Sequence, residues 1–126
     1  MTKVLLDTDV MIECLRGNQH VLNSLRHLSD QGSVIYYSTI SRAEIYCGIR
    51  ASEEHATGEF FRQMEPLPVD DLVAEKAGRY QSRYRKSHSV ELGDALIAAT
   101  AHVHQLLLYT FNLRHYPMDD IEFFGA

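Results

Sequence analysis

Long apolar runs are absent from the sequence, and this absence sets the first limit on the class of protein. No stretch approaches the ~18 consecutive apolar residues that a membrane span requires, so we expect no membrane insertion. Met1-Thr2-Lys3 leads directly into a strand-like segment and lacks the charged, apolar and small-residue regions of a secretory signal. The sequence therefore predicts a cytoplasmic protein.

Cysteine is also scarce. Cys14 and Cys47 are far apart on helix-like segments, with no Cys-x-x-Cys spacing. This arrangement favours reduced thiols in the core, and a disulfide between them is the alternative. No His and Cys residues have the spacing of a zinc site, which argues against a zinc-binding domain.

Positive charge is in deficit as well, because 12 Lys and Arg face 17 Asp and Glu and give a net charge of −5. Proteins that coat nucleic acid non-specifically neutralise phosphates with cations, so this balance argues against that class. A nuclease is still compatible with it, because acids gathered at one site recruit divalent cations that hold the phosphate. Repeats and Pro/Gly-rich linkers are absent too, so residues 1–126, 45% hydrophobic, predict a single domain.

Short apolar segments alternate with helical patterns along the chain. We expect strands at residues 4–6, 34–37, 67–69 and 106–109, and an edge strand at 121–124. Helical spacing and capping residues predict helices at about 8–15, 18–32, 41 onward, 53–64, 70–86 and 92–103, with a loop at 111–117. This alternation is typical of an α/β sandwich with a mainly parallel sheet.

Three acids lie at positions where a folded domain seldom places a charge. Asp7 directly follows the first strand, and ligands of α/β sheets collect beyond the carboxyl ends of strands. Glu44 and Asp94 have mostly apolar or small neighbours on their helical faces, and burying an unpaired charge costs several kcal/mol.

Each of the three acids also has an ordinary structural interpretation, which stays open. Asp7 is placed to cap the first helix, and Glu44 completes a Ser-x-x-Glu capping box with Ser41. Asp94 is placed as a late N-cap after Gly93. Taken together, the three acids indicate a cation site. Neighbouring carboxylates repel unless a cation neutralises them, and oxygen ligands favour Mg²⁺ or Mn²⁺, which activate water for phosphodiester hydrolysis.

Four segments carry a family resemblance that spans essentially the whole chain. In order, they are LLDTDV (5–10), STISRAE (38–44), ELGDALIAATA (91–101) and LYTFNLRHY (108–116). With these segments the chain resembles PIN-domain proteins, specifically the VapC-like toxins of prokaryotic toxin–antitoxin pairs. The resemblance implies a Rossmann-like three-layer α/β/α sandwich whose mainly parallel sheet has four to five strands. It further implies a Mg²⁺- or Mn²⁺-dependent endoribonuclease, a homodimer, and inhibition by a small VapB-like antitoxin.

The resemblance also assigns roles to individual residues. Asp7, Glu44 and Asp94 match the metal-site acids, and Thr8 and Thr110 match polar residues that support the site. The sequence departs from the fullest pattern where many relatives carry a fourth acid, because Asn112 and His115 occupy those positions. Asn112 offers a carbonyl oxygen without charge, which predicts weak binding of a second ion. His115 is either a phosphate contact or a solvated loop histidine, and Asp9 either adds charge to the site or caps the first helix.

Basic residues suggest where RNA binds. Arg42, near Glu44, and Arg114, near Asn112, are candidates for contacting the scissile phosphate. A second group interleaves cations with aromatic rings on one predicted helix: Arg79, Tyr80, Arg83, Tyr84, Arg85 and Lys86. Such a group either binds single-stranded RNA or forms a solvated helix end favoured by the helix dipole.

Other functions fit the sequence less well. Asp7-Thr8-Asp9 resembles the opening of haloacid dehalogenase phosphatases, but Met11 stands where that family has Thr or Val. Receiver domains need a lysine near the final strand, and no lysine follows Lys86. The main rival is a catalytically weak PIN-like module that binds RNA or a partner protein, which the missing fourth acid supports.

Overall fold

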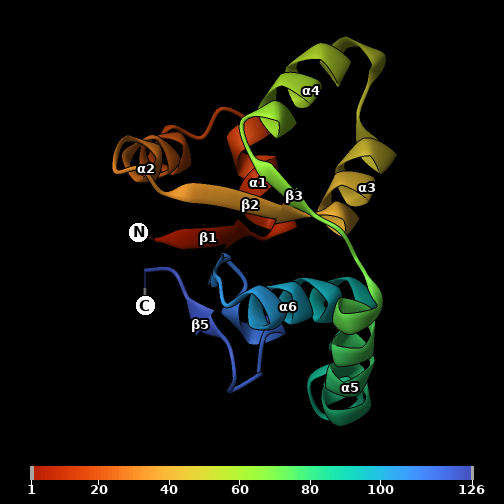
Figure 1. Cartoon of the computed structure of the whole chain (residues 1–126). Helices are drawn as coiled ribbons and strands as arrows, with labels where there is room; N and C mark the ends of the chain where they lie inside the picture. Colours follow the sequence, from red (N-terminus) through yellow and green to blue (C-terminus); the bar gives the residue numbers. More distant parts are fainter. Residues whose placement is uncertain (1, 126) are drawn as a thin grey trace.

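The computed structural model describes residues 2–125, which form a five-stranded parallel sheet between two layers of helices (Figure 1). The strand order is β3-β2-β1-β4-β5. The strands are β1 (Lys3–Leu6), β2 (Val34–Ser38), β3 (Glu65–Leu67), β4 (Leu107–Tyr109) and β5 (Glu122–Phe123). The expected α/β sandwich with a parallel sheet is therefore confirmed.

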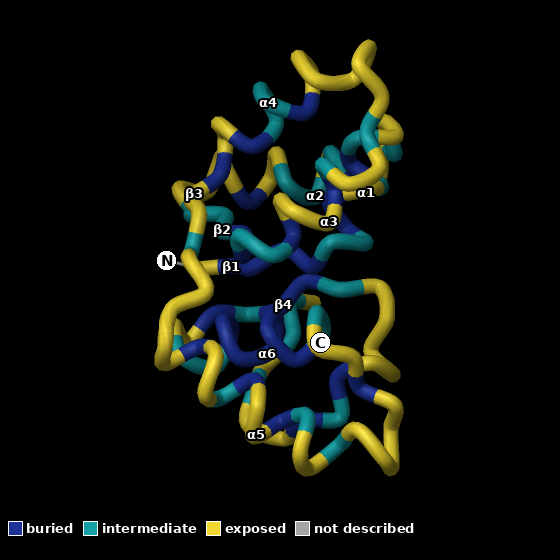
Figure 2. Tube along the Cα trace, turned by 90° about the vertical axis from the view of Figure 1, so that its right-hand side faces the viewer, coloured by how far each residue is buried: buried dark blue, intermediate teal, exposed yellow. Residues whose placement is uncertain are grey.

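The helices cover both faces of the sheet. In the view of Figure 1, α5 and α6 lie below the sheet and the other helices lie above or beside it. The helices are α1 (Thr8–Leu15), α2 (Gln19–Asp30), α3 (Thr39–Gly48), α4 (Glu54–Arg62), α5 (Asp71–His88) and α6 (Leu92–His104), with short 3-10 turns at Ala51–Glu53 and Leu113–His115. Successive residues of a strand face opposite ways, so Leu5 packs toward α5 and α6 while Val4 and Leu6 pack toward α1. Figure 2 shows the buried residues gathered along the strands and α6.

Helix starts follow the capping residues in most places. The Asn18 side chain accepts a hydrogen bond from Val21 N at 3.3 Å, and Asp70 accepts one from Val73 N at 3.0 Å, as expected. The interpretation of Ser41 as a cap is wrong. Ser38, extended at the end of β2, already accepts from Ile40 N at 3.3 Å, so α3 begins at Thr39 and Ser41 is fully buried inside it.

Several other boundaries differ from expectation. The third strand lies at Glu65–Leu67 rather than 67–69, because its register pairs Leu67 with Ser38, the last residue of β2. The predicted helix at 53–64 begins as a 3-10 turn and ends at Arg62, and the predicted loop at 111–117 contains a 3-10 turn.

The two cysteines are both free, so the disulfide alternative is excluded. Cys14 is buried, which raises the pKa of its thiol to about 11. Cys47 is exposed, so its expected place in the core is wrong.

The sheet topology singles out one edge. From β1 the chain continues to β2 and β3, which lie on one side of β1 in the sheet. It then passes through α5 and α6 to β4, which lies on the other side of β1. In open α/β sheets ligands bind outside the carboxyl ends of the two strands at such a reversal, here β1 and β4, and we call the region beyond these two strand ends the crevice. Among residues 2–125, no helix has the length and apolar character needed to cross a membrane.

Candidate active site

Asp7 stands at the centre of the crevice. Its backbone N–H donates to the carbonyl of Tyr109 at 2.9 Å, which joins the ends of β1 and β4. The side chain is 6% exposed and caps α1, since Oδ1 accepts from Thr8 N at 2.7 Å. Oδ2 accepts from the hydroxyls of Thr110 and Tyr116, each at 2.8 Å. These donors compensate a buried carboxylate and fix its orientation.

Sequence reasoning missed Tyr116. Its side chain is buried, and burial together with the charge of Asp7 raises the pKa of the phenol far above its usual value. The hydroxyl therefore remains protonated and donates to Asp7. A tyrosine six residues beyond Thr110 carries no local signal that would have revealed this contact.

Glu44 reaches the site from α3. Its Oε1 lies 2.8 Å from the Thr8 hydroxyl, which also lies 2.8 Å from Ser41 Oγ. Glu44 is therefore not the partner of Ser41 in a capping box, because both side chains converge on Thr8. A Cβ at Gly93 would lie 3.3 Å from Glu44 Oε2, so the missing side chain at Gly93 lets α6 approach Glu44 closely.

Asp94 lies in the first turn of α6, half-buried. The N-cap of this helix is Glu91, so the interpretation of Asp94 as a late cap is wrong. Burial raises the pKa of Asp94 to about 6; nearby His115 acts against this rise, while the charges of Asp7, Glu91 and Glu44 add to it. His115 Nδ1 lies 3.5 Å from Asp94 Oδ2, and the imidazole is exposed.

Asp9 and Asn112 tie α1 to the loop after β4. Asp9 Oδ2 accepts from Phe111 N at 3.0 Å and from Asn112 Nδ2 at 3.1 Å, and Oδ1 accepts from Val10 N at 2.7 Å. Asn112 N donates to the Thr110 hydroxyl at 3.0 Å. Burial, followed by the charge of Asp7, raises the pKa of Asp9 to about 6. Asn112 and Asp9 are thus already occupied with each other.

The donor chemistry of the site suits a hard divalent cation, since the converging side chains offer oxygen atoms and repel one another. The side chains do not close around one point, because no three His, Cys, Asp or Glu residues in the described part of the chain lie close enough to hold an ion. Mg²⁺ commonly takes only one or two protein carboxylates and fills its shell with water, so the set fits a cation of that type.

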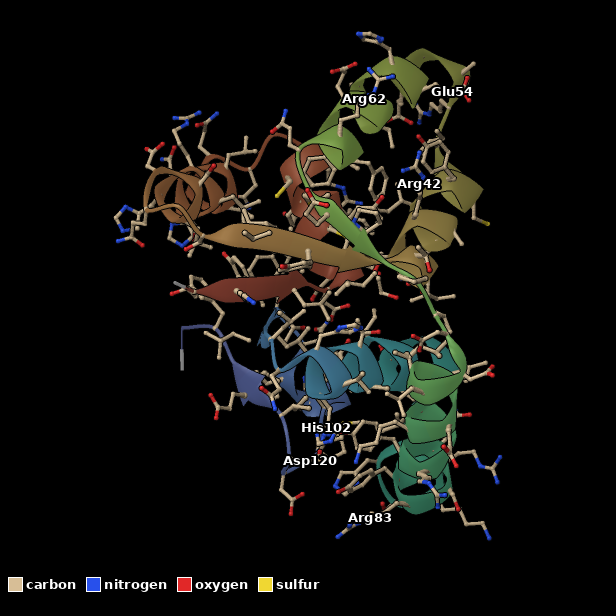
Figure 3. All side chains as sticks on the ribbon, in the orientation of Figure 1. Arg42, Glu54, Arg62, Arg83, His102 and Asp120 are labelled. Carbon is tan, nitrogen blue, oxygen red and sulfur yellow. The ribbon has the colours of Figure 1, made fainter. Side chains whose placement is uncertain are left out.

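The two arginines expected near the phosphate differ in their surroundings. Arg42 extends from α3 toward α4 (Figure 3), where its guanidinium lies 4.8 Å from the ring centroid of Phe61 and 3.2 Å from the Tyr37 hydroxyl. Arg114 is exposed on the 3-10 turn Leu113–His115, directly before His115 in the chain. A groove of about 260 Å³ lies between α1 and the end of α3, and it is lined by both apolar and charged residues: Ile12, Leu15, Arg16, Glu44, Ile45, Gly48, Ile49 and Glu53.

The fold and the site define an α/β protein with an acid-lined crevice between the central strands. The family model of the PIN domain matches residues 4–121. The chain is 37% identical over 116 residues to Ribonuclease VapC10 of Mycobacterium tuberculosis, covering 91% of this chain and 86% of that protein. It is 38% identical over 115 residues to Ribonuclease VapC19 of the same organism, covering 90% and 92%. The chain therefore belongs to the PIN domain family.

Solved structures agree with this fold. The crystal structure of DNA-bound VapBC from Salmonella typhimurium superimposes with a TM-score of 0.83 at 23% identity, covering 98% of each chain. The three-layer sandwich expected for the family is thus confirmed.

Proposed function

We propose that this chain is a Mg²⁺- or Mn²⁺-dependent endoribonuclease and the toxin of a toxin–antitoxin pair. The observation that carries the proposal is the grouping of Asp7, Glu44 and Asp94 at the carboxyl ends of β1 and β4. The ordinary capping interpretations fail for Glu44 and Asp94. The names of the two mycobacterial relatives support ribonuclease activity.

Asp7, Glu44 and Asp94 would hold the cation between them, directly or through the waters that complete its shell. When bound, the cation supplies an activated water and neutralises charge that develops on the phosphate. Thr110 and Tyr116 keep the Asp7 carboxylate pointing into the crevice, and Thr8 does the same for Glu44. His115, which lies 3.5 Å from Asp94, and its chain neighbour Arg114 are both exposed, and we propose that they contact the RNA phosphate.

The decisive experiment is cleavage of single-stranded RNA with Mg²⁺, with Mn²⁺ and with EDTA, comparing the parent chain with Asp94→Asn. We expect the parent chain to cleave RNA only when the cation is present. In Asp94→Asn the cleavage rate should fall by at least 10- to 100-fold, the loss typical of changes even to residues that contact a metal ligand rather than the metal. Asp30→Asn on α2 removes the same charge from an exposed helix end and serves as the control. Equal residual cleavage in all three proteins would contradict the proposal.

A catalytically weak module that binds RNA or a partner protein is the second candidate. It is favoured by Asn112, which brings no charge, and by the absence of a closed three-acid group in the described residues. RNA binding without cation-dependent cleavage in the same experiment would support this module instead.

The proposed partner is a VapB-like antitoxin, because the structural neighbours include VapBC assemblies. Glu44 is part of the lining of the groove between α1 and α3, so a partner segment bound there would cover Glu44. We propose that the antitoxin inhibits cleavage in this way and that the toxin acts as a homodimer in the cytoplasm.

A further inference from the structure

The second half of α5 carries the most concentrated positive charge of the chain. Residues 76–90 hold five Lys and Arg and no acid, whereas the rest of the sequence holds seven Lys and Arg against seventeen acids. Two of the five cations are paired with carboxylates, Lys76 with Asp120 and Arg79 with Glu75. Arg83, Arg85 and Lys86 are exposed, and within residues 2–125 none of them pairs with a carboxylate. We call these three residues the cationic end of α5.

A short, fixed connection joins this cationic end to α6, the helix that carries Asp94. Residues 89–91 join α5 to α6, and Asp94 is the third residue of α6. Ser89 takes a left-handed conformation, with φ 54°, and Gln81 Nε2 donates to the Val90 carbonyl at 3.0 Å. Asp94 is six residues beyond His88, the last residue of α5, so the Cα atoms of these two residues lie at most roughly 22 Å apart, a distance that a few nucleotides can span.

The aromatic rings between these cations are not available to RNA bases. Tyr80 is 5% exposed, and its hydroxyl donates to Asp120 at 2.6 Å. Tyr84 is partly buried against the same core and packs on Tyr80 and His88. The interleaved pattern in the sequence therefore reflects two helix faces, a buried aromatic face and an exposed cationic one. In Figure 3 Arg83 lies at the lower end of α5, away from the sheet, and its guanidinium lies 5.3 Å from the Tyr84 ring centroid.

We propose that the cationic end of α5 binds the phosphate backbone of the RNA strand whose neighbouring phosphodiester enters the acid-lined crevice. This inference rests on the proposed function and adds the path of the substrate across the surface. The rest of the chain is strongly acidic and repels a polyanion such as RNA, whereas the cationic end of α5 attracts it. Because phosphates are contacted and bases are not, this surface contributes affinity without sequence preference.

The test is the salt dependence of binding to a labelled single-stranded RNA of roughly ten nucleotides, followed by fluorescence anisotropy in EDTA. EDTA separates binding from cleavage, so failure of the nuclease proposal leaves the measurement intact. The variant combines Arg83→Gln, Arg85→Gln and Lys86→Gln. The matched control combines Lys3→Gln, Arg26→Gln and Arg62→Gln, which remove three exposed charges from β1, α2 and α4.

Each phosphate contact on a single strand contributes about 0.7 to the slope of log K against log salt, so the variant should lose about 2 from that slope. We expect at least about a tenfold loss of affinity at low salt, and an unchanged slope in the control. An unchanged slope in the variant, or an equal loss in both triple variants, would overturn the proposal. Lys86→Gln alone should lose about 0.7 and keeps the test valid if the triple variant folds poorly.

Discussion

The carboxylates at the two ends of the sheet have pKa values shifted in opposite directions. At the amino ends of the strands, Asp120 meets Lys76 Nζ at 2.7 Å and the Tyr80 hydroxyl at 2.6 Å, beside His102 (Figure 3). Partial burial by itself raises the pKa of Asp120, but the hydrogen bonds from Lys76 and Tyr80 outweigh it and lower the pKa below its usual value. At the carboxyl ends, burial and neighbouring acids raise the pKa of Asp9 and of Asp94 to about 6.

The difference shows which acids the fold uses for its own stability. The chain compensates Asp120 with its own donors, so that acid links α5 and α6 to the segment before β5. Among the described residues, the charged groups that act on Asp94 are an exposed histidine at 3.5 Å and three acids that repel it. Charge that the protein leaves uncompensated in a crevice is available to an external ligand, which is the physical signature of a functional site.

The largest expected effect belongs to Asp120→Ala. This change leaves the buried Tyr80 hydroxyl and the Lys76 ammonium without their acceptor, so the free energy of unfolding should fall by about 2 kcal/mol. Urea unfolding measures it, with the exposed neighbour Asp119→Ala as the control, which we expect to be close to neutral. Equal losses of stability at the two positions would mean that the contacts of Asp120 do not stabilise the fold.

Tyr116→Phe tests how the buried acid Asp7 is compensated. Asp7 Oδ2 would keep the Thr110 hydroxyl and lose the phenol, and a hydrogen bond to a charged group contributes about 1.5 kcal/mol. We expect that loss of unfolding free energy in EDTA, measured with urea. Tyr84→Phe is the control, because no hydrogen bond of its hydroxyl is found in the described structure. A neutral Tyr116→Phe would mean that the phenol does not orient Asp7.

Asp94→Asn should act in the opposite direction and stabilise the cation-free protein at pH 7 by about 1 kcal/mol, a value discounted for partial exposure. The folded pKa of about 6 lies above the usual 3.8, so the folded state holds more protons between these values and the penalty grows as pH rises. The advantage of the variant should therefore be full above pH 7 and vanish toward pH 4.

Urea unfolding in EDTA across this pH range measures the difference, with Asp30→Asn expected to give a flat profile. Asp120 has its pKa below 3.8, so its stabilisation persists throughout the scan and is lost only at lower pH. A clear loss of stability in Asp94→Asn at pH 7 would show that Asp94 supports the fold instead.

Local signals predicted the parts of the site that depend on one segment. The apolar run 4–6 ending at Asp7 predicted both a buried strand and an acid at its carboxyl end, and the order of elements predicted the sheet. The contacts that orient the acids were not predictable in this way. Tyr116 lies 109 residues from Asp7, and Glu44 lies 36 residues from Thr8. Such pairs depend on how loops and helices pack, which no local periodicity encodes.

The boundary of α3 teaches the same lesson on a smaller scale. Ser38 and Ser41 both have the chemistry of a cap, and the choice between them follows from where β2 ends. Once Ser38 caps the helix, Ser41 turns inward to the Thr8 hydroxyl and Glu44 is directed at the site. The end of β2, which strand pairing sets, therefore determines a contact of the candidate site that the capping pattern had assigned to local structure.

The smallest effect on stability, and the sharpest separation of fold from function, is expected for Gly93→Ala. Its Cβ would meet Glu44 Oε2 at 3.3 Å, and that exposed carboxylate end can yield by a few tenths of an ångström. Alanine is the better helix former, so the free energy of unfolding should rise by a few tenths of a kcal/mol. Cleavage should nevertheless fall several-fold, because a misplaced acid loses its orientation toward the phosphate.

Gly78→Ala, on the exposed face of α5, is the matched control for this change, since no atom lies within 4 Å of its added Cβ. It should give the same small gain in melting temperature and leave cleavage of the RNA as it was. If both alanine variants cleave equally well, the position of Glu44 does not matter to the reaction. If both variants are stabilised and only Gly93→Ala loses activity, Gly93 keeps Glu44 in position for cleavage at a cost in helix stability. Glu44 would then serve the reaction, whereas Asp120 serves the stability of the fold.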